Sequence, residues 1–252
     1  MSFGDLVDFQ ALSEPLAQFL MLAARCKCNI LISGGTGSGK TTMLNALSAF
    51  IGESERVVTI EDTAELQIQH PHVVKLETRN ASSEGTGAIT IRDLVINALR
   101  MRPDRVVVGE CRGAEAMEML QAMNTGHDGS MSTLHANTPM DAVHRLESMV
   151  MMASSSLPLI AIRRMIVSSV DFILQIRRLH DGSRKVVKVC EIVGLEGDQV
   201  VVDDIWSFEQ SSVDNGKVIG NFVHSGLSKR SVLYEKSQAM GLDKFVGDIF
   251  DA

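Results

Sequence analysis

The feature that most constrains this chain is a glycine-rich run between an apolar segment and an amphipathic one. Residues 34–41 read Gly-Gly-Thr-Gly-Ser-Gly-Lys-Thr and fit the pattern G-x-x-x-x-G-K-S/T. Glycines let successive backbone N–H groups converge on phosphate oxygens, and the start of a following helix adds partial positive charge. The run therefore predicts a nucleotide-binding loop made of Gly34, Gly35, Thr36, Gly37, Ser38, Gly39, Lys40, Thr41 and Thr42.

Within this loop, Lys40 is placed to reach the β- and γ-phosphates, and the Thr41 hydroxyl to ligate Mg²⁺. The loop does not define a reaction, because GTPases, kinases, transporters, helicases and motors all use one. The chain has no N-K-x-D run, which argues against a GTPase. It also has no Leu-Ser-Gly-Gly-Gln run after the loop, which argues against a transporter ATPase.

Short apolar segments alternate with helical patterns up to about residue 170, which predicts βαβ units and a mostly parallel sheet. Strands are expected at 29–33, 56–60, 73–76, 105–109 and 130–134, and helices at 13–24, 40–50, 94–101, 114–124, 139–152 and 158–170. Residues 77–90 are small and polar and are expected to form a mobile loop.

The pattern changes after residue 171. Residues 172–179, 185–193 and 200–208 predict an antiparallel meander, and the last part of the chain predicts one helix. The expected fold class is thus α/β, with a mostly parallel sheet plus a small C-terminal antiparallel meander and helix. We expect a lead-in linker and helix at 1–27, a core at 28–171 and an appendage at 172–252.

Composition excludes several classes of partner. The net charge is −7, whereas a general nucleic-acid coat needs an excess of Lys and Arg, so no nucleic acid is expected as a partner. One basic stretch, 177–185, is interpreted as an exposed hairpin. Cys26, Cys28, Cys111 and Cys190 contain no C-x-x-C pair, so no zinc is expected. No apolar segment reaches the roughly 20 uninterrupted residues of a membrane span, and no signal peptide is evident, so a cytoplasmic protein is expected.

Three further clusters narrow the function. Residues 60–65, Ile-Glu-Asp-Thr-Ala-Glu, follow a strand whose end should face the phosphates, where a carboxylate can orient or deprotonate an attacking water. Residues 105–112 form an apolar strand that ends in Gly109-Glu110 instead of the usual Walker B Asp. Residues 125–137 place His127 and His135 on either side of one strand.

In this order the motifs resemble those of the ring-forming secretion ATPases of type II secretion, type IV pili and type IV secretion. Residues 60–65 are similar to the family's Asp box, 109–112 to its atypical Walker B, and 125–137 to its His box. Residues 90–104 are similar to the Tad/Flp pilus branch, so the likeness to that branch is the strongest. The resemblance implies a RecA-like core that hydrolyses ATP with Mg²⁺ in a motor for pilus assembly or protein secretion.

The resemblance also implies residue roles. Glu65 matches the general base, with Glu61 and Asp62 as supporting acids. Glu110 would hold Mg²⁺ through water together with Thr41, and His135 would sense the γ-phosphate. The remaining three residues, His127, Arg79 and Arg112, would support the site or the contact between subunits. Implied partners are five further copies in a homohexameric ring and an inner-membrane platform protein, with the protein peripherally associated with the membrane complex.

One departure concerns the N-terminus. About 30 residues precede the phosphate-binding loop, whereas family members carry an upstream domain whose arginines close on the nucleotide. We therefore expect this chain to be the ATPase domain of such a protein, with weak turnover by itself. Two alternatives stay open at this point: a RecA-like motor stimulated by nucleic acid, and a module that binds ATP with little turnover.

Overall fold

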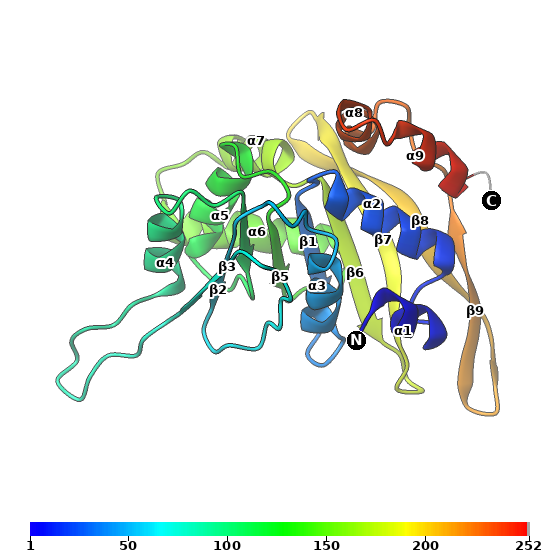
Figure 1. Ribbon diagram of the computed structural model, residues 1–252, viewed down its shortest axis with the longest axis horizontal. Coiled ribbons are helices and arrows are strands. Elements are labelled where there is room, and N and C mark those ends of the chain that lie inside the picture. Colours follow the sequence, from blue (N-terminus) through cyan, green and yellow to red (C-terminus); the bar gives the residue numbers. More distant parts are fainter. Residues whose placement is uncertain (251–252) are drawn as a thin grey trace.

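A nine-stranded sheet runs through residues 1–250, the part of the chain that the computed structural model describes (Figure 1). Its strand order is β3-β2-β4-β5-β1-β6-β7-β8-β9, and the first six of these are parallel. The parallel strands are β3 Val73–Glu77, β2 Val57–Glu61, β4 Arg105–Val108, β5 Met131–Leu134, β1 Ile30–Gly34 and β6 Phe172–Arg178. Each predicted parallel strand is present, and the apolar runs of β1, β2, β4 and β5 are buried on both faces, whereas the edge strand β3 is only partly buried.

The antiparallel strands continue the same sheet. β6 pairs in parallel with β1 on one side and antiparallel with the next strand on the other, so it joins the two parts. The remaining strands are β7 Arg184–Glu196, β8 Gln199–Asp214 and β9 Lys217–His224. The expected α/β fold class is confirmed. The appendage expected at 172–252 begins with β6, which pairs in parallel with β1.

Helices cover both faces of the sheet, and alternate strand residues supply the two cores. Ile30 and Ile32 pack with α3 and the helices at the two ends of the chain, whereas Leu31 packs with the helices that lie between β3 and β6 in the sequence. The first group is α1 Phe3–Asp8, α2 Glu14–Arg25, α3 Lys40–Ser48, α8 Val232–Ala239 and α9 Asp243–Phe250. The second group is α4 Ile91–Ala98, α5 Glu115–Asn124, α6 Pro139–Ala153 and α7 Leu159–Ser169.

Three elements differ from the sequence expectation: α1, β9 and the second C-terminal helix were not predicted. The helices at both ends are short, at six and eight residues, so they carry little periodic signal. β8 and β9 form a ribbon that leaves the body of the molecule, and Val213 and Ile219 near its tip are exposed. A ribbon in solvent on both sides has no alternation of buried and exposed residues to detect.

Residues 78–90, expected as a loop, form an arm that projects from the sheet (Figure 1). Arg79 and Ile89 exchange two backbone hydrogen bonds at its base, with N···O distances of 3.0 and 2.8 Å. The arm therefore has a hairpin-like base and a polar tip.

No helix within residues 1–250 is both long enough and apolar enough to cross a bilayer.

Candidate functional site

The phosphate-binding loop lies where β1 ends and α3 begins, at the carboxyl edge of the parallel strands. Gly37 and Gly39 have φ values of 69° and 102°, in the left-handed region that glycine tolerates best. A Cβ on Gly34 would come within 2.5 Å of the Ile176 carbonyl oxygen of β6, so only glycine fits there. The buried strand, the loop and the helix thus occur in the order that the sequence predicts.

Lys40 folds back onto this loop. Only 8% of the residue is exposed, and its Nζ donates to the carbonyl oxygens of Gly34 and Gly35 at 3.0 Å each. Burial lowers the pKa of Lys40, while the charge of Glu110 acts in the opposite direction. The Ser38 hydroxyl is also buried, and no atom of residues 1–250 bonds to it. A cation held on weak backbone acceptors and an unsatisfied hydroxyl both fit a phosphate group as their partner.

Lys40 contacts His135, which in turn contacts Glu110. Its Nζ lies 3.3 Å from His135 Nε2, and the same nitrogen of His135 lies 2.9 Å from Glu110 Oε1. Burial, followed by the charge of Lys40, lowers the pKa of His135, so the imidazole is neutral at pH 7. The structure therefore brings together the loop Lys, the Walker B Glu and the second His of the His box.

Arg112 extends this group toward the strand end that carries the acidic cluster. It forms an ion pair with Glu110 and lies 3.3 Å from an Asp62 carboxylate oxygen. Its hydrogen bonds with Glu110 raise the pKa of Arg112 above its usual value. The pair is open to solvent, because 60% of the Arg112 side chain is exposed. Arg112 can therefore exchange partners at little cost.

Glu61 and Glu65 differ in what they can do. Glu61 is 4% exposed, and its Oε1 accepts hydrogen bonds from the backbone N–H groups of Glu65 and Leu66 at 3.0 and 2.8 Å. A Cβ on Gly109 would lie 2.9 Å from Glu61 Cγ, so the glycine of the Walker B strand makes room for this carboxylate. Glu61 shapes the turn, while Glu65 at the end of that turn is exposed and available for chemistry.

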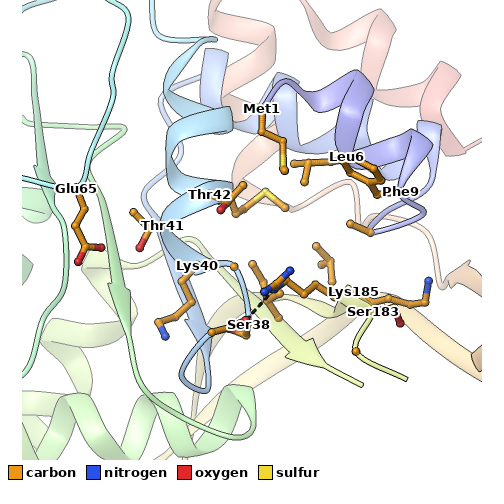
Figure 2. Close-up of a pocket in the computed structure, with 18 residues that line it drawn as sticks. Met1, Leu6, Phe9, Ser38, Lys40, Thr41, Thr42, Glu65, Ser183 and Lys185 are labelled. Atoms are coloured by element: carbon orange, nitrogen blue, oxygen red, sulfur yellow. Dashed lines mark hydrogen bonds between the residues drawn. The ribbon is translucent and has the colours of Figure 1, made fainter. Parts of the chain in front are cut away.

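A cavity of about 770 Å³ lies beside the loop (Figure 2). Thr41 and Thr42 of α3 line it, and Glu65 lies beside Thr41. The N-terminal segment supplies an apolar wall, where Met1, Leu6 and Phe9 point toward the cavity. Lys40 also lines the cavity. The space therefore combines a phosphate-binding side with an apolar side.

The chain supplies few metal ligands here. Within residues 1–250, no group of three His, Cys, Asp or Glu residues could hold a metal by itself. Mg²⁺ at nucleotide sites typically takes one or two protein oxygens and completes its shell with phosphates and water. The Thr41 hydroxyl and the Glu110 carboxylate are ligands of that type, so the residues present fit a magnesium ion bound with a nucleotide.

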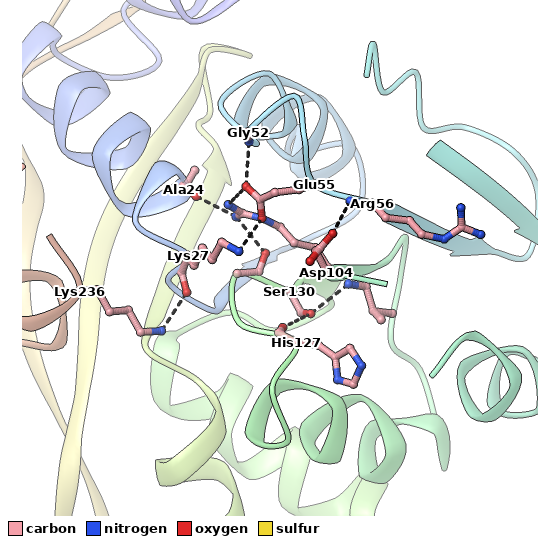
Figure 3. A network of polar contacts seen from close by, with 12 residues as sticks. Ala24, Lys27, Gly52, Glu55, Arg56, Asp104, His127, Ser130 and Lys236 are labelled. Atoms are coloured by element: carbon pink, nitrogen blue, oxygen red, sulfur yellow. Dashed lines mark hydrogen bonds and ion pairs between the residues drawn. The ribbon is translucent and has the colours of Figure 1, made fainter. Parts of the chain in front are cut away.

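Two predicted residues make no contact with Lys40, His135 or Glu110 among the described residues. Arg79, at the base of the arm, donates from Nε to the Gly87 carbonyl and lines a separate cavity of about 330 Å³ together with Asp62 and Arg112. His127 comes before β5 and therefore lies at the opposite edge of the sheet (Figure 3). Its Nδ1 is 3.2 Å from the Ala122 carbonyl oxygen. The structure does not bring His127 to the phosphate-binding loop.

Two residues that the motifs do not include also contact the site. Arg184, from the hairpin between β6 and β7, donates from Nε to the Gly37 carbonyl at 2.8 Å. Gln175 of β6 donates from Nε2 to the Ala136 carbonyl at 3.1 Å, directly after His135. The only sequence signal for Arg184 was the basic stretch 177–185, interpreted as a hairpin, and that hairpin is confirmed.

Comparisons with known proteins agree with this arrangement. Residues 1–236 match the family described as "Type II/IV secretion system protein". The conjugal transfer protein TrbB of Rhizobium radiobacter is 38% identical over 77% of this chain and 56% of that protein. The type IV secretion system protein VirB11 of Bartonella quintana is 37% identical over 70% of this chain and 50% of that protein.

Among solved structures, the VirB11 ATPase of the Brucella suis type IV secretion system, in complex with sulphate, has a TM-score of 0.64 and 31% identity. The match covers 75% of this chain and 55% of that one. The chain spans about half the length of the curated relatives it matches.

Proposed function

The chain belongs to the type II/IV secretion system protein family, and from this premise we propose that it is the ATP-hydrolysing core of a secretion or pilus-assembly motor. The observation that best supports the proposal is the contact of Lys40 with His135, and of His135 with Glu110. These residues come from three motifs that are separated by up to 95 positions in the sequence. Hydrolysis of ATP at the end of the phosphate-binding loop is the chemistry they share.

In the proposed reaction, the backbone N–H groups of the loop and Lys40 bind the phosphates, and Glu65 accepts a proton from the attacking water. Mg²⁺, when bound with ATP, would supply positive charge at the phosphates, and the Thr41 hydroxyl and the Glu110 carboxylate would hold it. His135 contacts Lys40 and Glu110, so it is placed to respond to the γ-phosphate. The products are ADP and phosphate.

The assembly is part of the proposal. We expect six copies in a ring, docked on an inner-membrane platform protein from the cytoplasmic side. Each ATP would lie near a subunit boundary, where a neighbour's arginine completes the site. Arg79 is a candidate for that contact, because it lies at the base of the projecting arm and beside the Asp62–Arg112 pair. Residues 90–104 favour a Tad/Flp-type pilus machine, with type II or type IV secretion as the wider class.

The test is phosphate release from ATP by the purified full-length protein. Lys40→Ala and Glu65→Ala should each lower the rate about a hundredfold or more, since one removes phosphate binding and the other removes the base. Glu53→Gln is the matched control, because Glu53 is exposed and lies outside the site. If Lys40→Ala and Glu65→Ala hydrolyse ATP as fast as the parent, the assignment is wrong. A rate that depends on added single-stranded DNA would instead support a nucleic-acid motor.

A further inference from the structure

The hairpin between β6 and β7 brings a second cation to the phosphate-binding loop. Arg184 opens β7 and donates from Nε to the Gly37 carbonyl oxygen at 2.8 Å. Its Cδ would lie 3.4 Å from a Cβ built on Gly39, so the side chain packs along the loop. Arg184 lines the same cavity as Thr41 and Thr42. A residue of the antiparallel strands, 147 positions from Gly37, is thus part of this cavity.

The hairpin is fixed by contacts that do not involve Arg184. Asp181 in its turn accepts from the Ser183 N–H at 2.9 Å and from the Val218 N–H of β9 at 2.8 Å. Hydrogen bonds from Ser183 and Val218 hold the pKa of Asp181 at about 2, so it stays ionised. Lys185, which is 4% exposed, donates to the Gln10 carbonyl at 2.8 Å. The position of Arg184 is therefore set by the surrounding fold.

Most of the donors of Arg184 are available. A guanidinium has five N–H donors, and within residues 1–250 only its Nε–H makes a hydrogen bond, with no ion pair. Lys40 differs, since its Nζ already contacts two carbonyls and His135. Glu65 is the one carboxylate among the residues that line the cavity, and it lies next to α3. The terminal amines of Arg184 are thus free to bind an anion in this space.

The two cations both line the cavity but contact different parts of the loop. Lys40 Nζ contacts the Gly34 and Gly35 carbonyls at the end of β1, whereas Arg184 contacts the Gly37 carbonyl and packs beside Gly39, where α3 begins. His135, which we propose responds to the γ-phosphate, contacts Lys40. We propose that Arg184 binds the α- and β-phosphates of the nucleotide, so that the C-terminal hairpin completes the phosphate site within one chain. This inference rests on the proposed function.

The experiment compares equilibrium binding of ATP and ADP by calorimetry in the parent and in single variants of the whole protein. Arg184→Ala should weaken binding of both nucleotides by the same factor, about tenfold, because both carry the α- and β-phosphates. Arg184→Gln keeps an N–H donor for the Gly37 carbonyl but carries no charge, so it should bind as weakly as Arg184→Ala. Arg177→Ala is the control for net charge, since Arg177 is exposed and does not line the cavity.

Each other outcome contradicts the inference in a distinct way. Equal affinities in Arg184→Ala and Arg177→Ala would show that Arg184 does not contact the nucleotide. Parent affinity in Arg184→Gln would show that the residue only holds the loop. Loss of ATP binding with unchanged ADP binding would place Arg184 at the γ-phosphate. A parent that binds neither nucleotide, or a Lys40→Ala variant that binds like the parent, would instead overturn the proposed function itself.

Discussion

The two edges of the parallel sheet use the same kinds of charged residues in opposite ways. At the amino edge, Arg105 is fully buried, and its nitrogens donate to Glu55 and to the Ala24 and Gly129 carbonyls (Figure 3). At the carboxyl edge, the Arg112 side chain is largely exposed and forms ion pairs with Asp62 and Glu110. The buried Arg105 thus has hydrogen-bond acceptors for all three of its nitrogens, whereas the exposed Arg112 can exchange its partners.

The buried contacts at the amino edge stabilise the fold, and Arg105 and Glu55 lie at the opposite edge of the sheet from the phosphate-binding loop. The Arg105–Glu55 pair ties the end of α2 to the starts of β4 and β5, which come from distant parts of the chain. Gly129 has a φ of 82°, and a Cβ there would collide with the Arg105 guanidinium, so even the backbone is fitted to this pair. A phosphate-binding edge built in the same way could not release its cations to a nucleotide. We infer that the amino edge stabilises the sheet that positions the carboxyl edge.

The largest effect is expected from Arg105→Met. Removing one member of a buried ion pair leaves Glu55 with Lys27 as its remaining cationic partner, at 3.2 Å, and takes one donor away from each of the Ala24 and Gly129 carbonyls. The free energy of unfolding, measured by urea denaturation, should fall by about 3–5 kcal/mol. The double variant Arg105→Met/Glu55→Leu should recover part of that loss, because no unpaired charge remains. If the free energy of unfolding of Arg105→Met falls by less than about 1 kcal/mol, Arg105 at the amino edge contributes no more to stability than an exposed ion pair.

The contribution of the Arg105–Glu55 pair should also appear in the pH dependence of the free energy of unfolding. Burial alone would raise the pKa of the Glu55 carboxyl, but its hydrogen bonds with Arg105 and the charge of Arg105 outweigh this and hold the pKa at about 2, below the usual 4.5. Because folding lowers the pKa of Glu55, its ionised carboxylate stabilises the folded protein at pH values above its pKa in the unfolded chain. This stabilisation is lost as the pH falls toward the pKa of Glu55 in the folded protein. Between pH 6 and pH 3, Glu55 should therefore account for a loss of about 2 kcal/mol.

The control for this pH dependence is Glu55→Gln, which has no carboxylate to titrate at this position. Its unfolding free energy should fall less steeply over the same pH range than that of the parent. Parallel curves for the two proteins would mean that the pKa of Glu55 is not lowered by folding.

The smallest effect is expected from Arg112→Met, the matched change at the other edge. Exposed ion pairs contribute between about 0 and 1 kcal/mol, so the free energy of unfolding should change by less than about 1 kcal/mol. The same urea titration used for Arg105→Met measures it. A loss as large as that of the Arg105 variant would show that the phosphate-binding edge is also needed to stabilise the fold.

The sequence predicted most of the parallel half because its signals are local. The strands are continuous apolar runs, the loop is a contiguous motif, and Thr90 and Asp93 form the capping box that begins α4. The β8–β9 ribbon was missed beyond residue 208, although Asn215-Gly216, both with positive φ, is a strong hairpin signal. Local sequence patterns therefore predicted the strands that are buried in the sheet, and missed the exposed end of the ribbon.

The site was only partly predictable, because local sequence patterns do not show which distant residues come into contact in the fold. The motifs indicated Lys40, Glu110 and His135, and the structure brings them together. Nothing local distinguishes buried Glu61 from exposed Glu65, because their difference depends on Gly109 of another strand. In the same way, the hairpin was expected, but its contact with the loop through Arg184 depends on how β6 packs beside β1.

Glu65→Gln in the full-length protein decides whether the carboxyl edge of the sheet hydrolyses ATP. ATP affinity and single-turnover phosphate release should be measured on the same preparation. We expect parent-like affinity, because Glu65 binds no phosphate, and phosphate release slower by about a hundredfold or more, because the base is absent. Phosphate release at the parent rate, with ATP bound, would contradict it.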